Sequence, residues 1–366
     1  MENNKVFAVI LAGGRGERFW PQSRASHPKQ LLRLMGNLTM IEQATDRLIP
    51  LVPVENILVI TNQEYVNSMQ QLLRRIPSGN IIGELTGLDT APCMALAAGI
   101  IRARAGAGGD PVMVVSPADH IIRNSGRFRE IMADAVAYAA KNEVLVTLGV
   151  KPRFLSTGFG YVKHGILLEQ TEHTRIFQVE SFTEKPNSAI AEACIASGRC
   201  WWNSGFFVWR HSVIMNAMQE VAPGLHKLAA EAELAELEHD LLPVLRSGYA
   251  ALSRNSIDYA IMEKTGNIVV AEVDFDWEDV GSWTSMRSQT RAGANNNVVR
   301  GLFASLDTYD CCVVSTPGHL VATIDVRDLI IVHTDDATLV CSEKSAQRVK
   351  ELVQKLNKNP EMQKFL

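Results

Sequence analysis

Residues 6–30, VFAVILAGGRGERFWPQSRASHPKQ, organise this chain. The apolar run at residues 6–11 has the length of one buried β-strand, and glycines follow it at once. Three cations, Arg15, Arg18 and Lys29, come soon afterwards. Bare backbone N–H groups after a strand, with cations close behind, can surround and neutralise a phosphate chain. The stretch therefore predicts a phosphate-binding loop at the end of a first strand.

Two better-known phosphate loops do not fit this pattern. No Gly-Lys-Ser or Gly-Lys-Thr follows at the spacing of a Walker A loop. The run Gly14-x-Gly16 ends on Phe19, where a dinucleotide fingerprint requires glycine. The plainer alternative is a glycine turn between a strand and a helix with solvated charges. The density of Gly, Arg and Lys in so short a span argues against that alternative.

Composition narrows the class of protein. The 366 residues, 46% hydrophobic and 21% charged, are typical of a globular chain with one large and one smaller domain. A net charge of −4 provides no basic surface for nucleic acid or for an anionic membrane. No apolar run reaches the roughly 20 residues of a membrane span, and no signal-peptide pattern is visible, so a cytoplasmic location is expected. The six scattered cysteines fit free thiols, with Cys311 and Cys312 on opposite faces of a strand.

The order of the predicted elements indicates two domains. Strand and helix patterns alternate through residue 150, which predicts a Rossmann-like α/β domain with a mixed, mostly parallel sheet. Further helices are expected over residues 225–245 and up to about Arg291. Short β runs at residues 298–341 then predict a small C-terminal β domain, arranged for example as a short left-handed β-helix and closed by a helix at 345–356. The expected domains are residues 1–292 and 293–366, and the second makes a homodimer plausible.

Polar residues at the ends of predicted strands are the candidate site. Asp119 and Asp279 each sit in a turn of small residues, and two carboxylates near a phosphate loop can hold Mg²⁺. Glu184 and Lys185 offer an acceptor for sugar hydroxyls beside a cation for a sugar phosphate. Asn203 could hold further hydroxyls. The alternatives are ordinary turn residues for the aspartates and Asn203, and a surface ion pair for Glu184 and Lys185.

A family resemblance unites these pieces. The chain resembles the sugar-1-phosphate nucleotidylyltransferases, in particular the bacterial mannose-1-phosphate guanylyltransferases. The matching segments, in the order of that family, are LAGGRGERFWPQSR with PKQ, DTAPCMALAA from Asp89, SPADH at 116, TGFGYV at 157, FTEKP at 182, WNSGFF at 202, SIDYAIMEK at 256 and DWEDVGSW at 276.

The resemblance implies a nucleotidyltransferase that joins GTP and α-mannose 1-phosphate into GDP-mannose and pyrophosphate, with magnesium as cofactor. It also implies positions for the ligands. Arg18 and Lys29 would bind phosphates, Asp119 and Asp279 would coordinate magnesium, and the backbone of Leu11, Ala12, Gly13, Gly14 and Gly16 would surround GTP. The nucleoside would meet Glu84, Asp89 and Thr90, and the sugar phosphate would meet Gly160, Glu184, Lys185 and Asn203.

One departure concerns the base. Many relatives read Arg-Asn-Thr where this chain reads Leu88, Asp89 and Thr90. An aspartate can still accept hydrogen bonds from the guanine N1–H and amino group, so a purine remains compatible. Two alternatives stay open: the same chemistry with another sugar 1-phosphate or nucleotide, and a non-catalytic homologue that binds nucleotide sugar.

Overall fold

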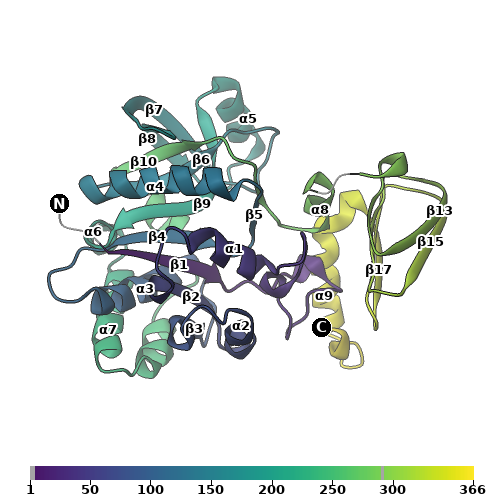
Figure 1. Ribbon diagram of the computed structural model, residues 1–366, viewed down its shortest axis with the longest axis horizontal. Coiled ribbons are helices and arrows are strands. Elements are labelled where there is room, and N and C mark those ends of the chain that lie inside the picture. Colours follow the sequence, from purple (N-terminus) through teal and green to yellow (C-terminus); the bar gives the residue numbers. More distant parts are fainter. Residues whose placement is uncertain (1–4, 290–291) are drawn as a thin grey trace. The chain divides into compact units, whose positions relative to one another are not determined.

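The computed structural model describes residues 5–289 and 292–366 (Figure 1). The chain forms two compact units, and each is interrupted in sequence. Unit 1 comprises residues 1–13, 44–118 and 122–277, and unit 2 comprises residues 14–43, 119–121 and 278–366. The expected domain boundary at residues 292 and 293 stays a prediction, and the helix end expected at Arg291 lies outside the described residues.

Unit 1 is built on a nine-stranded mixed sheet with the order β3-β2-β1-β4-β9-β6-β10-β8-β7. Parallel pairs join β1 to β2 and β4, β2 to β3, and β6 to β10, whereas β7, β8 and β9 pair antiparallel with their neighbours. The sheet therefore contains fewer parallel strand pairs than the strand–helix alternation in the sequence indicates. The strands are β1 (Val6–Ala12), β2 (Ile57–Asn62), β3 (Ile81–Glu84), β4 (Val112–Pro117), β6 (Leu145–Val150), β7 (Tyr161–Gln170), β8 (Arg175–Thr183), β9 (Cys200–Arg210) and β10 (Ile268–Val273).

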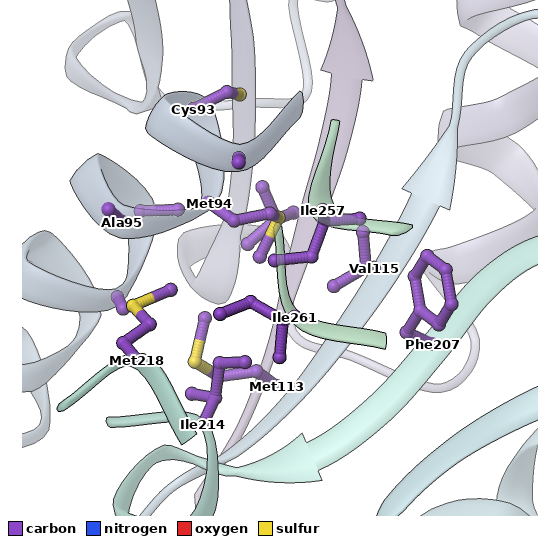
Figure 2. Close-up of a cluster of buried hydrophobic side chains, with 14 of the residues drawn as sticks. Cys93, Met94, Ala95, Met113, Val115, Phe207, Ile214, Met218, Ile257 and Ile261 are labelled. Atoms are coloured by element: carbon purple, nitrogen blue, oxygen red, sulfur yellow. The ribbon is translucent and has the colours of Figure 1, made fainter. Parts of the chain in front are cut away.

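Helices pack on both faces of this sheet. On one face, Met94 from α3 meets Met113 and Val115 from β4 and Ile214 from α6 in a shared apolar cluster (Figure 2). On the other face, the Phe128 ring of α4 lies 5.2 Å from a ring of β9. Each such buried side chain contributes about 2 kcal/mol through the hydrophobic effect. The helices are α1 (Met40–Leu48), α2 (Val66–Leu72), α3 (Thr90–Ala105), α4 (Ser125–Lys141), α5 (Ser188–Ser197), α6 (His211–Val221) and α7 (Pro223–Leu237).

The helix expected over residues 225–245 is interrupted: residues 225–237 lie in α7, as expected, but residues 238–241 are not helical. Helix α7 ends at Leu237, and His239 then adopts a left-handed backbone with φ +58°. A separate π-helical turn, Val244–Gly248, follows. The run of Ala, Glu and Leu residues has the propensity for one long helix, but the chain reverses at His239 and Pro243 begins the next turn.

The C-terminal part of unit 2 is a coiled β domain. Strands β12 (Val298–Arg300), β14 (Cys312–Val314) and β16 (Leu329–His333) run parallel in one sheet, which the antiparallel β17 (Thr338–Ser342) closes. Strands β13 (Leu302–Tyr309) and β15 (Leu320–Arg327) form a second, parallel sheet. Successive coils thus add one strand to each sheet, as expected for a β-helix; its hand stays a prediction.

The two adjacent cysteines and the terminal helix of this domain can be compared with the sequence predictions. Cys312 belongs to one buried cluster and Cys311 to another, which confirms their opposite orientation. All six cysteines are free thiols. The terminal helix α9 (Val349–Asn357) begins later than expected, because a 3₁₀ segment, Glu343–Arg348, precedes it.

The segment after Gly13 belongs to unit 2 and packs into its core. Phe19 and Trp20 share a buried cluster with Trp283 of α8 (Trp283–Gln289) and with apolar residues of β12, β14 and β16. The Trp283 indole N–H donates to the Trp20 carbonyl at 3.1 Å, and the Trp20 indole N–H donates to the Phe365 carbonyl at 2.8 Å. The β domain therefore helps to hold the conformation of the glycine-rich segment.

Two short strands, β5 (His120–Ile122) and β11 (Trp277–Asp279), pair with one another, and all their residues except Ile122 and Trp277 belong to unit 2. The chain leaves unit 2 within β5 and re-enters it within β11. Across the described residues, no helix is both long and apolar enough to cross a membrane.

Candidate active site

The end of β1 fixes the start of the glycine loop. The Leu11 carbonyl accepts from the Ala118 N–H at 3.0 Å, and the Ala12 carbonyl accepts from the Thr61 hydroxyl at 3.0 Å. Gly13 follows and is exposed. The carbonyls of Leu11 and Ala12 are therefore used by the fold.

The loop itself turns at Gly16, whose backbone is left-handed with φ +70°. A Cβ at this position would overlap the Cβ of Lys29, so only glycine permits this close approach. The Gly16 carbonyl accepts from the Phe19 N–H at 2.8 Å and from the Ser23 hydroxyl at 2.7 Å. Within the part of the chain that the structure describes, the N–H groups of Gly14 and Gly16 have no acceptor. These two amides are available to an anionic ligand.

Lys29 is the fixed cation of the loop. It begins the 3₁₀ turn Lys29–Leu31, and its side chain is 8% exposed. Its ammonium lies 3.0 Å from Asp119 Oδ2, 4.0 Å from Asp279 Oδ1 and 5.6 Å from the centre of the Phe19 ring. Arg18 is exposed, and its guanidinium has no hydrogen bond or ion pair among the described residues. Unit 2 thus presents one cation held by carboxylates and one open to solvent.

The two aspartates come together because β5 and β11 pair. Asp119 directly precedes β5 and Asp279 ends β11, so both carboxylates reach the ammonium of Lys29. The His120 imidazole is also close, with Nε2 3.7 Å from Asp119 Oδ1 and 3.9 Å from Asp279 Oδ1. Burial alone would raise the pKa of Asp119, but the charge and hydrogen bond of Lys29, together with the electrostatic effect of the neighbouring His120, outweigh it and hold that pKa below its ordinary value. Asp119 is therefore an anion at neutral pH.

The donor set of this cluster suits a magnesium ion that keeps other ligands. In residues 5–289 and 292–366, no group of three or more His, Cys, Asp or Glu side chains is arranged to hold a metal. A metal bound by Asp119 and Asp279 would take its remaining ligands from water and from substrate phosphates. Mg²⁺ coordinates in this manner, since it binds through one or two carboxylates and retains several waters.

Glu84, at the end of β3, is a buried carboxyl near the start of the loop. Its Oε1 accepts from the Tyr249 hydroxyl at 2.8 Å, and its Oε2 lies 3.5 Å from where a Cβ on Gly13 would be. Burial raises the pKa of Glu84 to about 7; the hydrogen bond from Tyr249 partly opposes this shift and the charge of Asp89 adds to it. Glu84 therefore changes charge near neutral pH.

Asp89 and Thr90 serve the fold at the start of α3. Asp89 is the N-cap, with φ +74°, and its carboxylate accepts from the Thr90 N–H at 2.9 Å. The Thr90 hydroxyl accepts from the Ile257 N–H at 2.9 Å. The second oxygen of Asp89 lies 3.5 Å from the exposed Arg254 guanidinium. Capping uses one oxygen of the Asp89 carboxylate, so at most the other oxygen, which faces Arg254, can contact a base.

The residues expected at the sugar phosphate gather around Gly160, just before β7. A Cβ on Gly160 would overlap Glu184 Oε2 and would lie 3.2 Å from the Asn203 Cβ, so glycine lets both side chains approach. Glu184 Oε1 forms an ion pair with the Lys185 ammonium at 2.9 Å, while the Glu184 side chain is only 8% exposed. Glu184 Oε2 is buried and has no hydrogen-bond partner among the described residues. This orphaned carboxylate oxygen is a candidate acceptor for a hydroxyl.

Four further polar residues contact the candidate site residues but were not singled out from the sequence. His120 lies beside the aspartates, Tyr249 holds Glu84, and Thr147 and Asp258 both contact Asn203. His120 and Asp258 fall within SPADH and SIDYAIMEK, so the quoted segments contained them. Tyr249 and Thr147 carry no such signal, since a tyrosine or threonine among apolar residues is typical of an ordinary core.

Comparison with known proteins identifies the family. The Nucleotidyl transferase family model matches residues 7–295, and the MannoseP isomerase/GMP-like beta-helix domain model matches residues 301–356. Mannose-1-phosphate guanylyltransferases of Escherichia coli (strain K12) and Klebsiella pneumoniae are 36% and 38% identical, over 97% of this chain and 74% of each relative. A solved structure named mannose-1-phosphate geranyltransferase, from Thermus thermophilus, superposes with a TM-score of 0.85 at 30% identity, covering 96% of this chain and 99% of that one.

These matches cover both the sheet that carries Glu84 and Asn203 and the loop that carries Lys29. They also agree with the β-helix seen after residue 298. The chain is a nucleotidyltransferase enzyme and belongs to the mannose-1-phosphate guanylyltransferase family.

Proposed function

We propose that the chain transfers GMP from GTP to α-D-mannose 1-phosphate, releasing GDP-mannose and pyrophosphate. The observation that carries this proposal is the cluster in unit 2, where Lys29, Asp119 and Asp279 meet beside the unused amides of Gly14 and Gly16. Relatives that bear the name of this activity match nearly the whole chain. A non-catalytic homologue would be expected to have lost one of these charged groups.

The reaction requires positioning and charge rather than a nucleophilic side chain. A phosphate oxygen of mannose 1-phosphate attacks the α-phosphorus of GTP and forms a new P–O bond. The bond between the α-phosphorus and the oxygen that bridges to the β-phosphorus breaks, and pyrophosphate leaves. The attacking group is already an anion, so catalysis depends on alignment and on charge stabilisation. Lys29 and Arg18 neutralise the triphosphate, and the amides of Gly14 and Gly16 donate to its oxygens. Asp119 and Asp279 would hold the magnesium ion, which supplies further neutralisation of phosphate charge when bound.

The sugar end has its own polar groups in unit 1. Lys185 is 54% exposed and can contact the sugar phosphate, while the buried oxygen of Glu184 and the amide of Asn203 contact hydroxyls. Glu84, with Tyr249 bound to it, contacts the guanine base. A carboxylate suits guanine because it can accept from both the N1–H and the amino group.

Pyrophosphate release across a grid of nucleoside triphosphates and hexose 1-phosphates tests this function. We expect GTP with mannose 1-phosphate to have the highest kcat/KM of all pairs. A higher value for another pair would reassign the substrate. Binding of GDP-mannose without turnover of any pair would show a non-catalytic nucleotide-sugar-binding protein instead.

Replacement of Asp119 tests the metal assignment. In Asp119→Asn, the Mg²⁺ concentration that gives half-maximal rate should rise at least about tenfold, because one anionic ligand is lost. A magnesium titration of initial rates measures this shift. Asp335→Asn, at an exposed position of the β domain, is the matched control and should titrate like the parent protein. An identical titration for both variants would exclude Asp119 as a ligand.

The pKa of Glu84 predicts a pH dependence of GTP use. Because that pKa is raised to about 7, the carboxylate fraction increases about tenfold between pH 6 and pH 8. We expect kcat/KM for GTP to rise with pH over this window, as the anion that accepts from guanine forms. In Glu84→Gln this rise should disappear. The difference between the two profiles is the quantity to compare, since the phosphates of GTP titrate equally in both; superimposable profiles would contradict the assignment.

A further inference from the structure

Asp258 begins a π-helical turn, Asp258–Met262, directly beside the candidate sugar residues of unit 1. Its carboxylate Oδ1 accepts from the Asn203 side-chain N–H at 2.8 Å. Burial, together with the neighbouring charge of Glu184, raises the pKa of Asp258 well above its ordinary value, despite the opposing effects of Lys185 and Asn203. The fold thus keeps a second carboxyl near Glu184 at an electrostatic cost. The reaction proposed above does not use this carboxyl.

The hydrogen bonds of Asn203 explain what this carboxyl does. The Asn203 carbonyl oxygen accepts from the Thr147 hydroxyl at 2.8 Å and from the Gly205 N–H at 3.2 Å. Its amide nitrogen donates one hydrogen to Asp258. A flipped amide would set its N–H₂ against the Gly205 N–H and its oxygen against a carboxylate, so the network allows one orientation. One N–H of Asn203 remains for a ligand.

The remaining N–H of Asn203 complements the free oxygen of Glu184. Glu184 Oε2 is a buried acceptor without a partner among the described residues. Both side chains lie against Gly160, where a Cβ would overlap Glu184 Oε2 and touch the Asn203 side chain. A hydroxyl can accept from the amide and donate to the carboxylate, and two adjacent hydroxyls can use both groups together.

We propose that Asp258 is a positioning residue of the sugar site: it orients the Asn203 amide so that Asn203 and Glu184 together recognise neighbouring hydroxyls of the sugar 1-phosphate. The proposal rests on the function proposed above, because it assumes that this site binds the sugar. Asp258 acts through Asn203. Its loss should therefore weaken sugar binding and leave GTP binding and the chemical step intact.

Steady-state kinetics with mannose 1-phosphate and GTP test this role. We expect Asp258→Ala to raise the KM for mannose 1-phosphate about 10- to 100-fold, the range for loss of a hydrogen bond to a charged group, with KM for GTP and kcat near parent values. Asp258→Asn, which keeps an acceptor for Asn203, should restore most of this loss. Tyr259→Phe removes only an exposed hydroxyl bonded at 3.4 Å to the Glu184 carbonyl and should behave as the parent protein. Thermal unfolding establishes that each variant is folded.

Monodeoxy analogues of mannose 1-phosphate, lacking the hydroxyl at C2, C3 or C4, provide the second measurement. Each change alone, removal of the hydroxyl that Asn203 contacts or Asp258→Ala, should raise the KM for the sugar phosphate. Combined, the two changes should raise it clearly less than the product of the two separate factors, because both remove the same contact. Equal increases of both KM values in Asp258→Ala, failure of Asp258→Asn to restore binding, or full additivity for all three analogues would overturn the proposal. Absence of turnover of mannose 1-phosphate by the parent protein would instead contradict the proposed function.

Discussion

Lys29→Ala should lower kcat for GDP-mannose formation by about 100- to 1,000-fold, the range expected when one charge-stabilising group is lost. Lys29 is buried and lies 3.0 Å from Asp119 and 4.0 Å from Asp279. Its removal takes a positive charge from the proposed triphosphate site and leaves two carboxylates that repel each other. The pKa of Asp119 should then rise, since the Lys29 charge is a main cause of its lowering.

Pyrophosphate release at saturating substrates measures this effect, with thermal unfolding measured in parallel. Lys227→Ala, at a position of α7 whose side chain is 78% exposed, removes the same charge where only a surface ion pair with Glu231 is lost and should keep full activity. Lys29→Arg should recover part of the rate, because it restores the charge with a different shape. Parent-like turnover in a folded Lys29→Ala protein would remove Lys29 from the mechanism.

Gly16→Ala should lower kcat by about 100-fold without removing any charged group, as displacement of a catalytic group by about 1 Å can do. The added Cβ would overlap the Lys29 Cβ and would lie 3.1 Å from the Lys29 backbone nitrogen. The turn Lys29–Leu31 must therefore shift, and the ammonium with it. The left-handed backbone at φ +70° adds strain of about 1 kcal/mol to the free energy of folding.

Gly36→Ala is the matched control for this variant. Gly36 has a similar backbone, φ +68°, but a Cβ there meets no atom within 4 Å. Both variants should lose similar stability from backbone strain, and only Gly16→Ala should lose turnover. A Gly16→Ala protein as active as Gly36→Ala would show that close approach to Lys29 is not required.

Local patterns in the sequence predicted an element well where a single class of residue, apolar or glycine, dominates the segment. The run at residues 6–11 had to be a buried strand, and glycines after it had to form a loop. The helix predicted over residues 225–245 was confirmed only as far as Leu237, because propensity carries no information about the left-handed backbone at His239. The antiparallel pairing of β9 also lies beyond local patterns, since strand direction depends on which neighbours the chain meets.

The candidate site divides in the same manner. Lys29 was visible as a cation that follows the glycine loop, and Asp119, Glu184 and Asn203 as polar residues close to predicted strands. Tyr249 and Asp258 were not singled out, because their contacts with Glu84 and Asn203 join residues far apart in the chain. Their place beside these residues follows from packing in unit 1, which no short window of sequence contains.

The sequence by itself determined the composition of the glycine loop, the presence of its cations and carboxylates, and the order of the elements that carry them. Only the tertiary structure decided that Gly16 permits Lys29 to approach, that pairing of β5 with β11 brings Asp119 and Asp279 to one ammonium, and that Asp258 orients Asn203. The physical reason is range. Propensity and periodicity act over a few residues, whereas a charge cluster depends on distances of a few ångströms between residues that are far apart in sequence.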